Sequence, residues 1–515
     1  MMPGFTWTLW RCRQACLLLA LCLAPWPALA MTPDLIADLN GRDFAARAAA
    51  IDRIVIAVAE GDAQARQWLR DLADNRVPQV RLNNALRRKV ADAAAVLELT
   101  HRDPLRRDAA VTALLRTPPP AEFSEVVNTA LAQETLPALR TRLTVLAALV
   151  ALQGDDAAGR LNAVHQIGAS GDPRYRAQLR RLLEREPGGS WVEASPTIRE
   201  AAQKAIATLD RAEQRAHVVG TVFAGLSLGS ILLLAALGLA ITYGLMGVIN
   251  LAHGEFLMVG AYATYLVQKL FRQHFPAAFD WYPLAALPMA FIAAALVGVM
   301  IERLVIRHLY GRPLETLLTT FGISLLLMQG VRMIFGAQNV EVMNPSWMSG
   351  AVAIMPGLLL PWNRLVIIAF ALVVVLATWL VLNRTRLGLF VRATTQNRTM
   401  AACAGVPTAS VDTRAFALGA GVAGLGGCAL SQVGNVGPDL GQAYIIDSFM
   451  VVVLGGVGQL AGTVVGALGL GIMNKMMEPF WGAVLAKVAV LLLIILFIQK
   501  RPQGLFALKG RSVEA

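Results

Sequence analysis

Residues 219–243 read VGTVFAGLSLGSILLLAALGLAITY, a stretch of apolar and small residues without a charged side chain. A helix that crosses the hydrocarbon core of a bilayer needs about 20 residues of this kind. Lipid offers no hydrogen bonds to an exposed backbone, so such a segment must be helical to be stable there. The stretch therefore predicts a membrane-spanning helix and places the chain among integral membrane proteins.

Seven further apolar segments follow this one, and Gly, Ala, Ser and Thr recur within them. They lie at 248–270, 283–301, 317–335, 365–382, 415–433, 445–473 and 483–498. Small residues allow membrane helices to approach one another closely. We expect an all-α, polytopic helical membrane protein with about eight or nine spans, some of them broken by glycine.

The charge of the chain is unevenly distributed. The formal net charge is +12, and in the second half Arg and Lys gather in short loops between the apolar segments. This distribution is typical of cytoplasmic loops and does not resemble a nucleic-acid-binding surface, where basic residues interleave with aromatics. We expect the loops near 303–312 and 384–414 and the tail 499–515 in the cytoplasm, and the loops 336–363 and 434–444 in the periplasm.

The orientation of the tail requires an odd number of crossings. If the chain enters the membrane from outside, eight crossings leave the basic tail on the outside. The segment 445–473 contains LGGVGQLAG at 454–462, which is too rich in glycine for one uninterrupted helix. A turn at the cytoplasmic face within this segment gives nine crossings and places the tail inside.

The first thirty residues resemble a secretory signal peptide. Arg11 and Arg13 precede a short apolar run at 15–23, and the sequence Ala-Leu-Ala ends at Ala30. This pattern predicts cleavage after Ala30. The alternative is an uncleaved anchor helix, and both interpretations place residues 31 onward outside the cytoplasm.

Residues 31–217 differ in composition from the apolar region that begins at 218. Apolar residues recur there at spacings of three and four, which is typical of amphipathic helices, and breaks with Gly, Asp and Pro recur at 60–62, 102–104 and 170–173. Paired helices of this kind resemble HEAT-type repeats, and a plain helical bundle is the alternative. We therefore expect a signal peptide at 1–30, a periplasmic HEAT-like domain at 31–217, a transmembrane domain at 218–498 and a basic tail at 499–515.

Three polar residues, Asn250, His253 and Glu255, lie between apolar runs. Ionisable groups at membrane depth are costly and usually functional, so one hypothesis is a substrate-pathway or coupling cluster. The other is that Asn250 caps a helix and that His253 and Glu255 satisfy backbone and helix–helix hydrogen bonds. Lys487 lies near one end of the last segment, where snorkelling toward the interface or a pairing role accounts for it.

The sequence lacks the features of an enzyme. It contains no phosphate loop of the form GxxxxGK[ST] and no paired CxxC motifs, and its spans carry no set of nucleophile, base and orienting group. We expect no catalytic residue, metal or cofactor, so any ATP hydrolysis must come from other subunits.

Three stretches together resemble a known family. They are YGLMGVINLAHGEF at 243–256, RTRLGLFVRAT at 384–394, and VLGGVG at 453–458 with the closing RPQGLF at 501–506. These stretches are similar to the branched-chain amino-acid permease family of ABC importers, first-subunit type, and the resemblance covers residues 218–508.

The chain departs from that family by adding a signal peptide and about 185 exported residues. This extended architecture, together with GQAYIID at 441–447, resembles the permease subunits of urea ABC importers. The resemblance implies urea import across a bacterial inner membrane, with a second permease subunit forming a heterodimer, two cytoplasmic ATPase subunits and a periplasmic substrate-binding protein. Branched-chain amino acids or short amides are the alternative substrates. A membrane-anchored scaffold whose periplasmic domain is the active part is a further alternative.

Two cytoplasmic segments are candidates for contact with the ATPase subunits. The first has a helix-compatible run at 394–404 that presents Met400, and its basic residues are Arg384, Arg386, Arg392 and Arg398. The second is the glycine-rich turn with Gly455, Gly456 and Gly458, where a partner backbone can approach closely. The alternative is that the arginines fix orientation against anionic lipid.

Overall fold

The computed structural model describes residues 39, 44–59, 63–73, 76 and 84–506 of the chain. These residues belong to two compact units, 1–213 and 214–515. The predicted signal peptide with its cleavage site at Ala30, and the end of the basic tail, lie outside the described residues.

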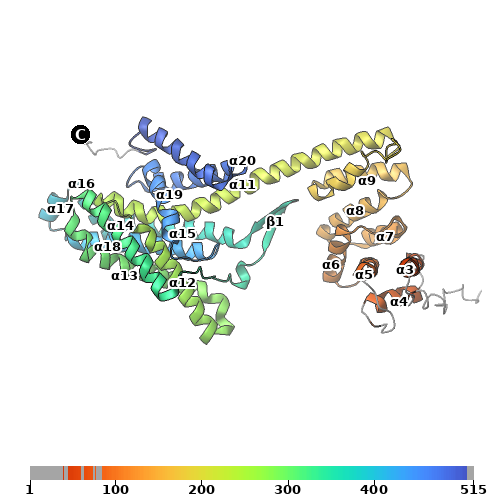
Figure 1. Cartoon of the computed structure of the whole chain (residues 1–515), viewed down its shortest axis with the longest axis horizontal. Coiled ribbons are helices and arrows are strands. Elements are labelled where there is room, and N and C mark those ends of the chain that lie inside the picture. The colour runs from red at the N-terminus through yellow and green to blue at the C-terminus, as the bar shows by residue number, and fades with distance from the viewer. Residues whose placement is uncertain (1–38, 40–43, 60–62, 74–75, 77–83, 507–515) are drawn as a thin grey trace, which may run out of the picture. The chain divides into compact units, whose positions relative to one another are not determined.

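The first unit is built from short helices (Figure 1). They are α3 (Phe44–Ala59), α4 (Ala63–Ala73), α5 (Asn84–Glu98), α6 (Pro104–Arg116), η1 (Ala121–Phe123), α7 (Ser124–Gln133), α8 (Pro137–Ala151), α9 (Ala157–Ser170), η2 (Pro173–Tyr175), α10 (Arg176–Arg181) and the first part of α11 (Pro196–Met246). Capping residues account for several boundaries: the Asp103 carboxylate accepts a hydrogen bond from Leu105 N at the start of α6, and Gly171, with φ of 67°, ends α9.

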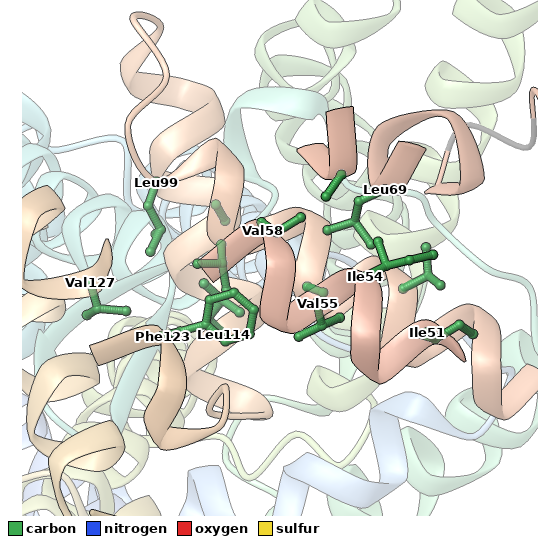
Figure 2. Packing of buried hydrophobic residues seen from close by; sticks show 14 of the residues in the cluster. Ile51, Ile54, Val55, Val58, Leu69, Leu99, Leu114, Phe123 and Val127 are labelled. Atoms are coloured by element: carbon green, nitrogen blue, oxygen red, sulfur yellow. The ribbon is translucent and has the colours of Figure 1, made fainter. Parts of the chain in front are cut away.

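The core of this unit is continuous through successive helices. Figure 2 shows Ile51, Ile54 and Val58 of α3 close to Leu69 of α4, with Leu114 and Phe123 in the same cluster. Most consecutive helices from α3 to α9 pack against one another, and α6 packs against α8. This arrangement suits the predicted HEAT-like stack, which stays a prediction.

One ion-pair arrangement occurs twice in the first unit. Arg107 Nε lies 2.8 Å from Glu134 Oε2, and Arg160 Nε lies 2.9 Å from Glu193 Oε2. Each glutamate precedes a helix that begins with proline, and the Glu134 carboxylate also accepts from Leu136 N. The hydrogen bond from Arg107 holds the pKa of Glu134 below its usual value. Recurrence of the same device is what a repeat architecture predicts.

The second unit consists almost entirely of helices. After α11 come α12 (His253–His274), η3 (Pro276–Trp281), α13 (Tyr282–Leu304), η4 (Ile306–Leu309), α14 (Pro313–Phe335), η5 (Ser346–Met348), β1 (Ala351–Met355), β2 (Leu358–Pro361), α15 (Trp362–Arg384), α16 (Arg386–Gln396), α17 (Arg398–Cys403), α18 (Thr408–Ser431), α19 (Leu440–Gly455) and α20 (Leu460–Lys500). Strands β1 and β2 form an antiparallel hairpin within the predicted loop 336–363. The all-α prediction is confirmed.

Six helical segments of the described chain are long and apolar enough to cross a membrane. They are Pro196–Gly244, Pro276–Leu304, Pro313–Phe335, Trp362–Arg384, Thr408–Ser431 and Leu460–Lys500. The apolar helix Leu440–Gly455 is shorter, and α12 carries Glu255, Lys269 and Arg272 along its length. The spans in α11 and α18 are mostly buried, so these two helices form the centre of the bundle.

Glycines bring the central helices into backbone contact. A β-carbon on Gly424 of α18 would lie 2.6 Å from the Ala294 β-carbon of α13, and one on Gly260 of α12 would meet the Gly424 backbone at 2.5 Å. Larger side chains cannot occupy these positions without separating the helices.

Two predicted spans need correction, and a third is confirmed as broken. The span predicted at 248–270 begins as a helix only at His253, because residues 247–252 form a non-helical segment that starts at Gly247, with φ of 63°. The segment 445–473 is broken as predicted: α19 ends at Gly455 and α20 begins at Leu460. The segment 483–498 continues from the same helix α20, which is interrupted at Gly482 (φ 76°, ψ 167°) soon after Pro479.

Candidate functional site

The three polar residues predicted for the pathway surround the start of α12, and all are buried. The non-helical segment 247–252 returns the chain from the end of α11 to the level of its middle. There the His253 Nε2 atom lies 3.1 Å from the Ala235 carbonyl oxygen. Because Ala235 lies within the long apolar stretch of α11, helix α12 begins inside the apolar layer and not at its edge.

Asn250 shapes the turn that precedes α12. Its Oδ1 atom accepts a hydrogen bond from Ala252 N at 3.0 Å, and Ala252 is the residue at the N-cap position. The Nδ2 group of Asn250 is buried without a hydrogen-bond partner in the described part of the chain. Asn250 therefore does not cap α12 itself. Its Oδ1 atom fixes the turn before the helix, and its Nδ2 donor group is left for another partner.

Glu255 lies in the first turn of α12, with 1% of its surface exposed. Its Oε1 atom accepts a hydrogen bond from Ser324 Oγ of α14 at 2.8 Å, whereas its Oε2 atom has no partner among the described residues. The hydroxyl of Tyr262, seven residues later on the same helix, is also buried and unpartnered within that part of the chain. A spacing of seven residues puts Tyr262 on the same face of α12 as Glu255, and this spacing is the signal that could have identified it. Neither Tyr262 nor Ser324 was predicted.

His253 follows the same pattern. One ring nitrogen contacts the Ala235 carbonyl oxygen, and Nδ1 has no partner in the described residues. Its ring packs edge-on against Phe256, with centroids 5.6 Å apart. Each of the three predicted residues thus makes one hydrogen bond within the protein and keeps one buried polar atom unsatisfied. Unsatisfied buried groups of native proteins require an explanation, and the role of these residues in a substrate pathway stays a prediction.

A second helix begins beside this cluster. A β-carbon on Gly441, near the start of α19, would lie 2.9 Å from Glu255 N and would overlap the backbone of Gly254. The starts of α12 and α19 therefore touch through two glycines. We call Asn250, His253, Glu255 and Tyr262 the pathway cluster. Helix starts carry partial positive charge, and broken helices with this arrangement line solute sites in transport folds.

The predicted helix at 394–404 is wrong in extent. Helix α16 ends at Gln396, Asn397 adopts extended backbone angles (φ −153°, ψ 102°), and α17 begins at Arg398. The physical cause is a cap: Asn397 Oδ1 accepts from Met400 N at 2.9 Å, which starts a new helix. Met400 is 65% exposed, as predicted for a contact residue, whereas Ala401 beside it is buried.

The four arginines of this segment have different surroundings. Arg384 and Arg386 are exposed, and Arg392 Nη1 donates to the Leu382 carbonyl oxygen at 2.6 Å. The Arg398 guanidinium instead forms an ion pair with the buried carboxylate of Asp412. Contact of these residues with an ATPase stays a prediction.

The glycine-rich turn is covered by the end of the chain. Gly455 and Gly456 are buried, because Leu505 N donates to the Leu454 carbonyl oxygen at 2.8 Å and Phe506 N donates to the Gly455 carbonyl oxygen at 3.3 Å. Gly458 remains exposed. A partner can therefore reach Gly458 directly, whereas the other two glycines serve close packing within this unit.

The two predicted contact segments border one cavity. Its volume is about 880 Å³, and Arg392 of α16 and Gly458 of the turn both line it. Its walls are mostly apolar and include Leu237, Val375 and Leu460. Separately, the Lys487 ammonium lies 3.0 Å from Asp447 Oδ2, so the pairing role considered for this lysine is the one that the structure shows.

Comparisons with known proteins place these features in context. Residues 221–499 match the family model described as the permease component of the branched-chain amino acid transport system. The chain is 28% identical over 295 residues to the high-affinity branched-chain amino acid transport system permease protein BraD of Pseudomonas aeruginosa, covering 56% of this chain and 95% of that protein. It is 28% identical over 300 residues to the corresponding LivH of Escherichia coli K12, covering 57% of this chain and 96% of LivH.

A more distant likeness extends beyond these proteins. The ribose import permease protein RbsC of Escherichia coli K12 is 29% identical over 140 residues, which cover 25% of this chain and 44% of RbsC. No solved structure matches the chain. The branched-chain amino acid relatives support the predicted family and favour the alternative substrate over urea.

Proposed function

The chain belongs to the family of permease components of branched-chain amino acid transport systems, and we propose that it carries urea, driven by ATP hydrolysis in separate subunits. It is a multi-pass inner-membrane protein, a permease subunit of an ABC importer and not an enzyme. Importers of this family work with ATPase subunits and a substrate-binding protein. The proposed assembly pairs this chain with a second, different permease subunit.

The pathway cluster is the observation that carries the substrate proposal. Glu255 Oε2 can accept hydrogen bonds and Asn250 Nδ2 can donate them, and both atoms are buried without partners in the described residues. Urea is neutral and planar, with N–H groups that suit a carboxylate and a carbonyl oxygen that suits an amide N–H. A passing urea molecule would satisfy both atoms.

The charge of the cluster supports a neutral solute. The hydrogen bond that the structure gives for the Glu255 carboxylate comes from Ser324, not from a basic side chain. An amino-acid zwitterion would need partners for both its ammonium and its carboxylate in a region of low polarity. The exported domain and the GQAYIID sequence at 441–447 resemble urea permeases and point the same way.

Branched-chain amino acids are the second candidate. The names of the BraD and LivH relatives favour them, and the mostly apolar walls of the 880 Å³ cavity would suit an aliphatic side chain.

We propose nine crossings, with the first domain in the periplasm and the tail in the cytoplasm. The hydrogen bonds of Leu505 and Phe506 with the turn at Leu454 and Gly455 support a common side for the turn and the tail. The end of α11 belongs to that side too, because a β-carbon on Gly244 would lie 2.6 Å from the Gly458 α-carbon. The basic loops identify this side as cytoplasmic under the positive-inside rule.

Uptake of radiolabelled urea and leucine tests the substrate. Cells lacking the subunit receive the wild-type chain, Glu255→Gln, or Glu315→Gln as a control at an exposed position of α14. The wild type and the control should restore urea uptake. Glu255→Gln should lower it about tenfold, the effect of losing one hydrogen bond to a charged group. Restoration of leucine uptake alone would select the second candidate, and restoration of neither would reject both.

Reporter fusions and cysteine labelling test the topology. A reporter that is active only in the cytoplasm should be active after Lys509 and inactive after Asp210. A cysteine at the exposed position Gly458 should react with a membrane-impermeant reagent from the cytoplasmic side. Labelling from the periplasm would contradict the nine-crossing arrangement.

A further inference from the structure

A second group of buried polar residues lies at the end of α13, on the same side of the bundle as the start of α12: Phe256 of α12 packs against Phe416 of α18, and Thr413, three residues earlier on α18, belongs to this group. Glu302, near the end of α13, is fully buried. Its Oε2 atom accepts from Thr413 Oγ1 of α18 at 2.7 Å, and its Oε1 atom accepts from the Tyr310 hydroxyl at 3.2 Å. Arg307 Nε lies 4.0 Å from the same carboxylate. Glu302 therefore joins α13, α18 and the loop between α13 and α14.

The short helix α17 is attached to this group through its first residue. The Arg398 guanidinium donates to both carboxylate oxygens of Asp412, one of them at 3.3 Å, and Asp412 is 4% exposed. The same guanidinium lies over the Tyr310 ring, 5.1 Å from its centroid. A planar guanidinium can hold a carboxylate with two hydrogen bonds while stacking on an aromatic ring, which an ammonium cannot do.

The helices held by this group are those that reach the pathway cluster. Helix α18 packs against both α12 and α13, and Gly424 of α18 lies between Gly260 of α12 and Ala290 of α13. Glycine contacts of this kind leave little space for the helices to move independently. A displacement of α17 would therefore pass through Arg398 and Asp412 into α18.

We propose that Arg398, Asp412, Tyr310 and Glu302 form a rigid link that transmits movement from α17 to α18 and α13. They are positioning residues: they contact neither the solute nor ATP, and they couple a surface that carries exposed Met400 to the helices around the pathway. The inference rests on the proposed docking of the ATPase at the segment 384–403.

A charge-reversal experiment on the complete importer tests the link. Arg398→Asp and Asp412→Arg are compared with the double variant, and Arg303→Lys serves as a control at an exposed position near Glu302. Three quantities are measured: co-purification of the ATPase, ATP hydrolysis stimulated by loaded binding protein, and solute uptake. Asp412→Arg, which lies outside the docking segment 384–403, should retain the ATPase, and both single variants should take up about tenfold less solute per ATP hydrolysed, an effect within the range known for coupling residues. The double variant should recover most of the wild-type ratio of solute uptake to ATP hydrolysis.

A conservative variant keeps the test decisive if a reversal prevents folding. Arg398→Lys retains the charge but loses the planar two-bond contact, so it should assemble normally with an intermediate ratio of uptake to hydrolysis. If uptake and hydrolysis fall by the same factor, or if Arg398→Lys equals the wild type, the link does not transmit movement. If no ATPase co-purifies with the wild type, the docking proposal fails instead.

Discussion

The two buried polar groups of the membrane unit differ in how completely their atoms are satisfied. Around Glu302, both carboxylate oxygens accept hydrogen bonds from the protein, and Asp412 is held by Arg398. In the pathway cluster, Asn250, His253, Glu255 and Tyr262 each keep an unpartnered polar atom in the described structure. A satisfied group fixes the packing of its helices, whereas an unsatisfied group at comparable burial is suited to a transient ligand.

The first unit also contains a satisfied group, and it allows the largest predicted effect. Glu134→Ala removes the carboxylate that holds Arg107 and the turn before α8. Loss of one partner from a buried ion pair costs about 3 kcal/mol, at the low end because Arg107 keeps some access to water. Hydrogen exchange of peptides from α6 and α8 in the full-length protein should accelerate about hundredfold.

Glu200→Ala is the matched control for this prediction. Glu200 pairs with Lys204 on an exposed face of α11, and pairs of this kind contribute little. Exchange in α6 and α8 should not change in this variant. Equal effects of the two substitutions would show that satisfaction of buried groups does not determine stability in this unit.

The same ion pairs predict sensitivity of the first unit to acid. The hydrogen bond from Arg107 lowers the pKa of Glu134 below its ordinary value of 4.5. Burial is the largest influence on Glu193 and by itself would raise its pKa, but the hydrogen bonds from Arg160 and Ser195 N and the charges of Arg160 and Arg199 together outweigh it, so that pKa is lowered too. A carboxylate whose pKa is lower in the folded state stabilises that state fully above pH 4.5 and loses this contribution as the pH falls through the folded pKa.

Pepsin cleavage of the full-length protein measures this loss. Between pH 4.5 and 3, cleavage within the first unit should accelerate more than cleavage of an unstructured reporter peptide. Glu134→Gln cannot titrate at that position and should show a weaker dependence on pH. A dependence as strong as that of the wild type would assign the effect to other carboxylates.

Sequence patterns predicted the helices well but only some of the breaks between them. Runs of apolar residues indicate spans because burial in lipid depends on length and composition, and the glycines at 455–458 revealed the break between α19 and α20. The late start of α12 and the break at Asn397 were missed. Both depend on single side chains, Asn250 and Asn397, that hydrogen-bond to the backbone two or three residues ahead.

Of the two buried polar groups, the sequence indicated mainly the one around the start of α12. Asn250, His253 and Glu255 are conspicuous because they interrupt an apolar region, and the structure buries all three around the start of α12. Apart from Arg398, the members of the group around Glu302 were not predicted, because they come from separate loops and helix ends that lie far apart in the sequence. Contacts such as that between Glu302 and Thr413, 111 residues apart, become visible only when the helices are packed.

Ser324→Ala tests whether the pathway cluster is less completely satisfied than the group around Glu302. Ser324 is the side chain that donates to Glu255, and without it both carboxylate oxygens lack a partner in the described residues. An unsatisfied buried acceptor costs about 2 kcal/mol, so the thermal midpoint of the purified protein should fall by several degrees. Added substrate should restore part of the loss if the solute reaches Glu255. Recovery with leucine but not with urea would favour the second candidate.

Thr413→Val is the matching substitution at the satisfied group, and we expect the smallest effect there. Valine preserves the shape of threonine and removes the hydroxyl that donates to Glu302 Oε2 at 2.7 Å. The Tyr310 hydroxyl still donates to the other oxygen and Arg307 remains nearby, so the carboxylate keeps a partner. The cost should be about 1 kcal/mol, the usual contribution of one hydrogen bond. In the same thermal assay the midpoint should fall less than in Ser324→Ala, and added substrate should not change it. A larger fall than in Ser324→Ala would mean that Glu302 depends on one donor as Glu255 does, and the distinction between the two groups would no longer hold.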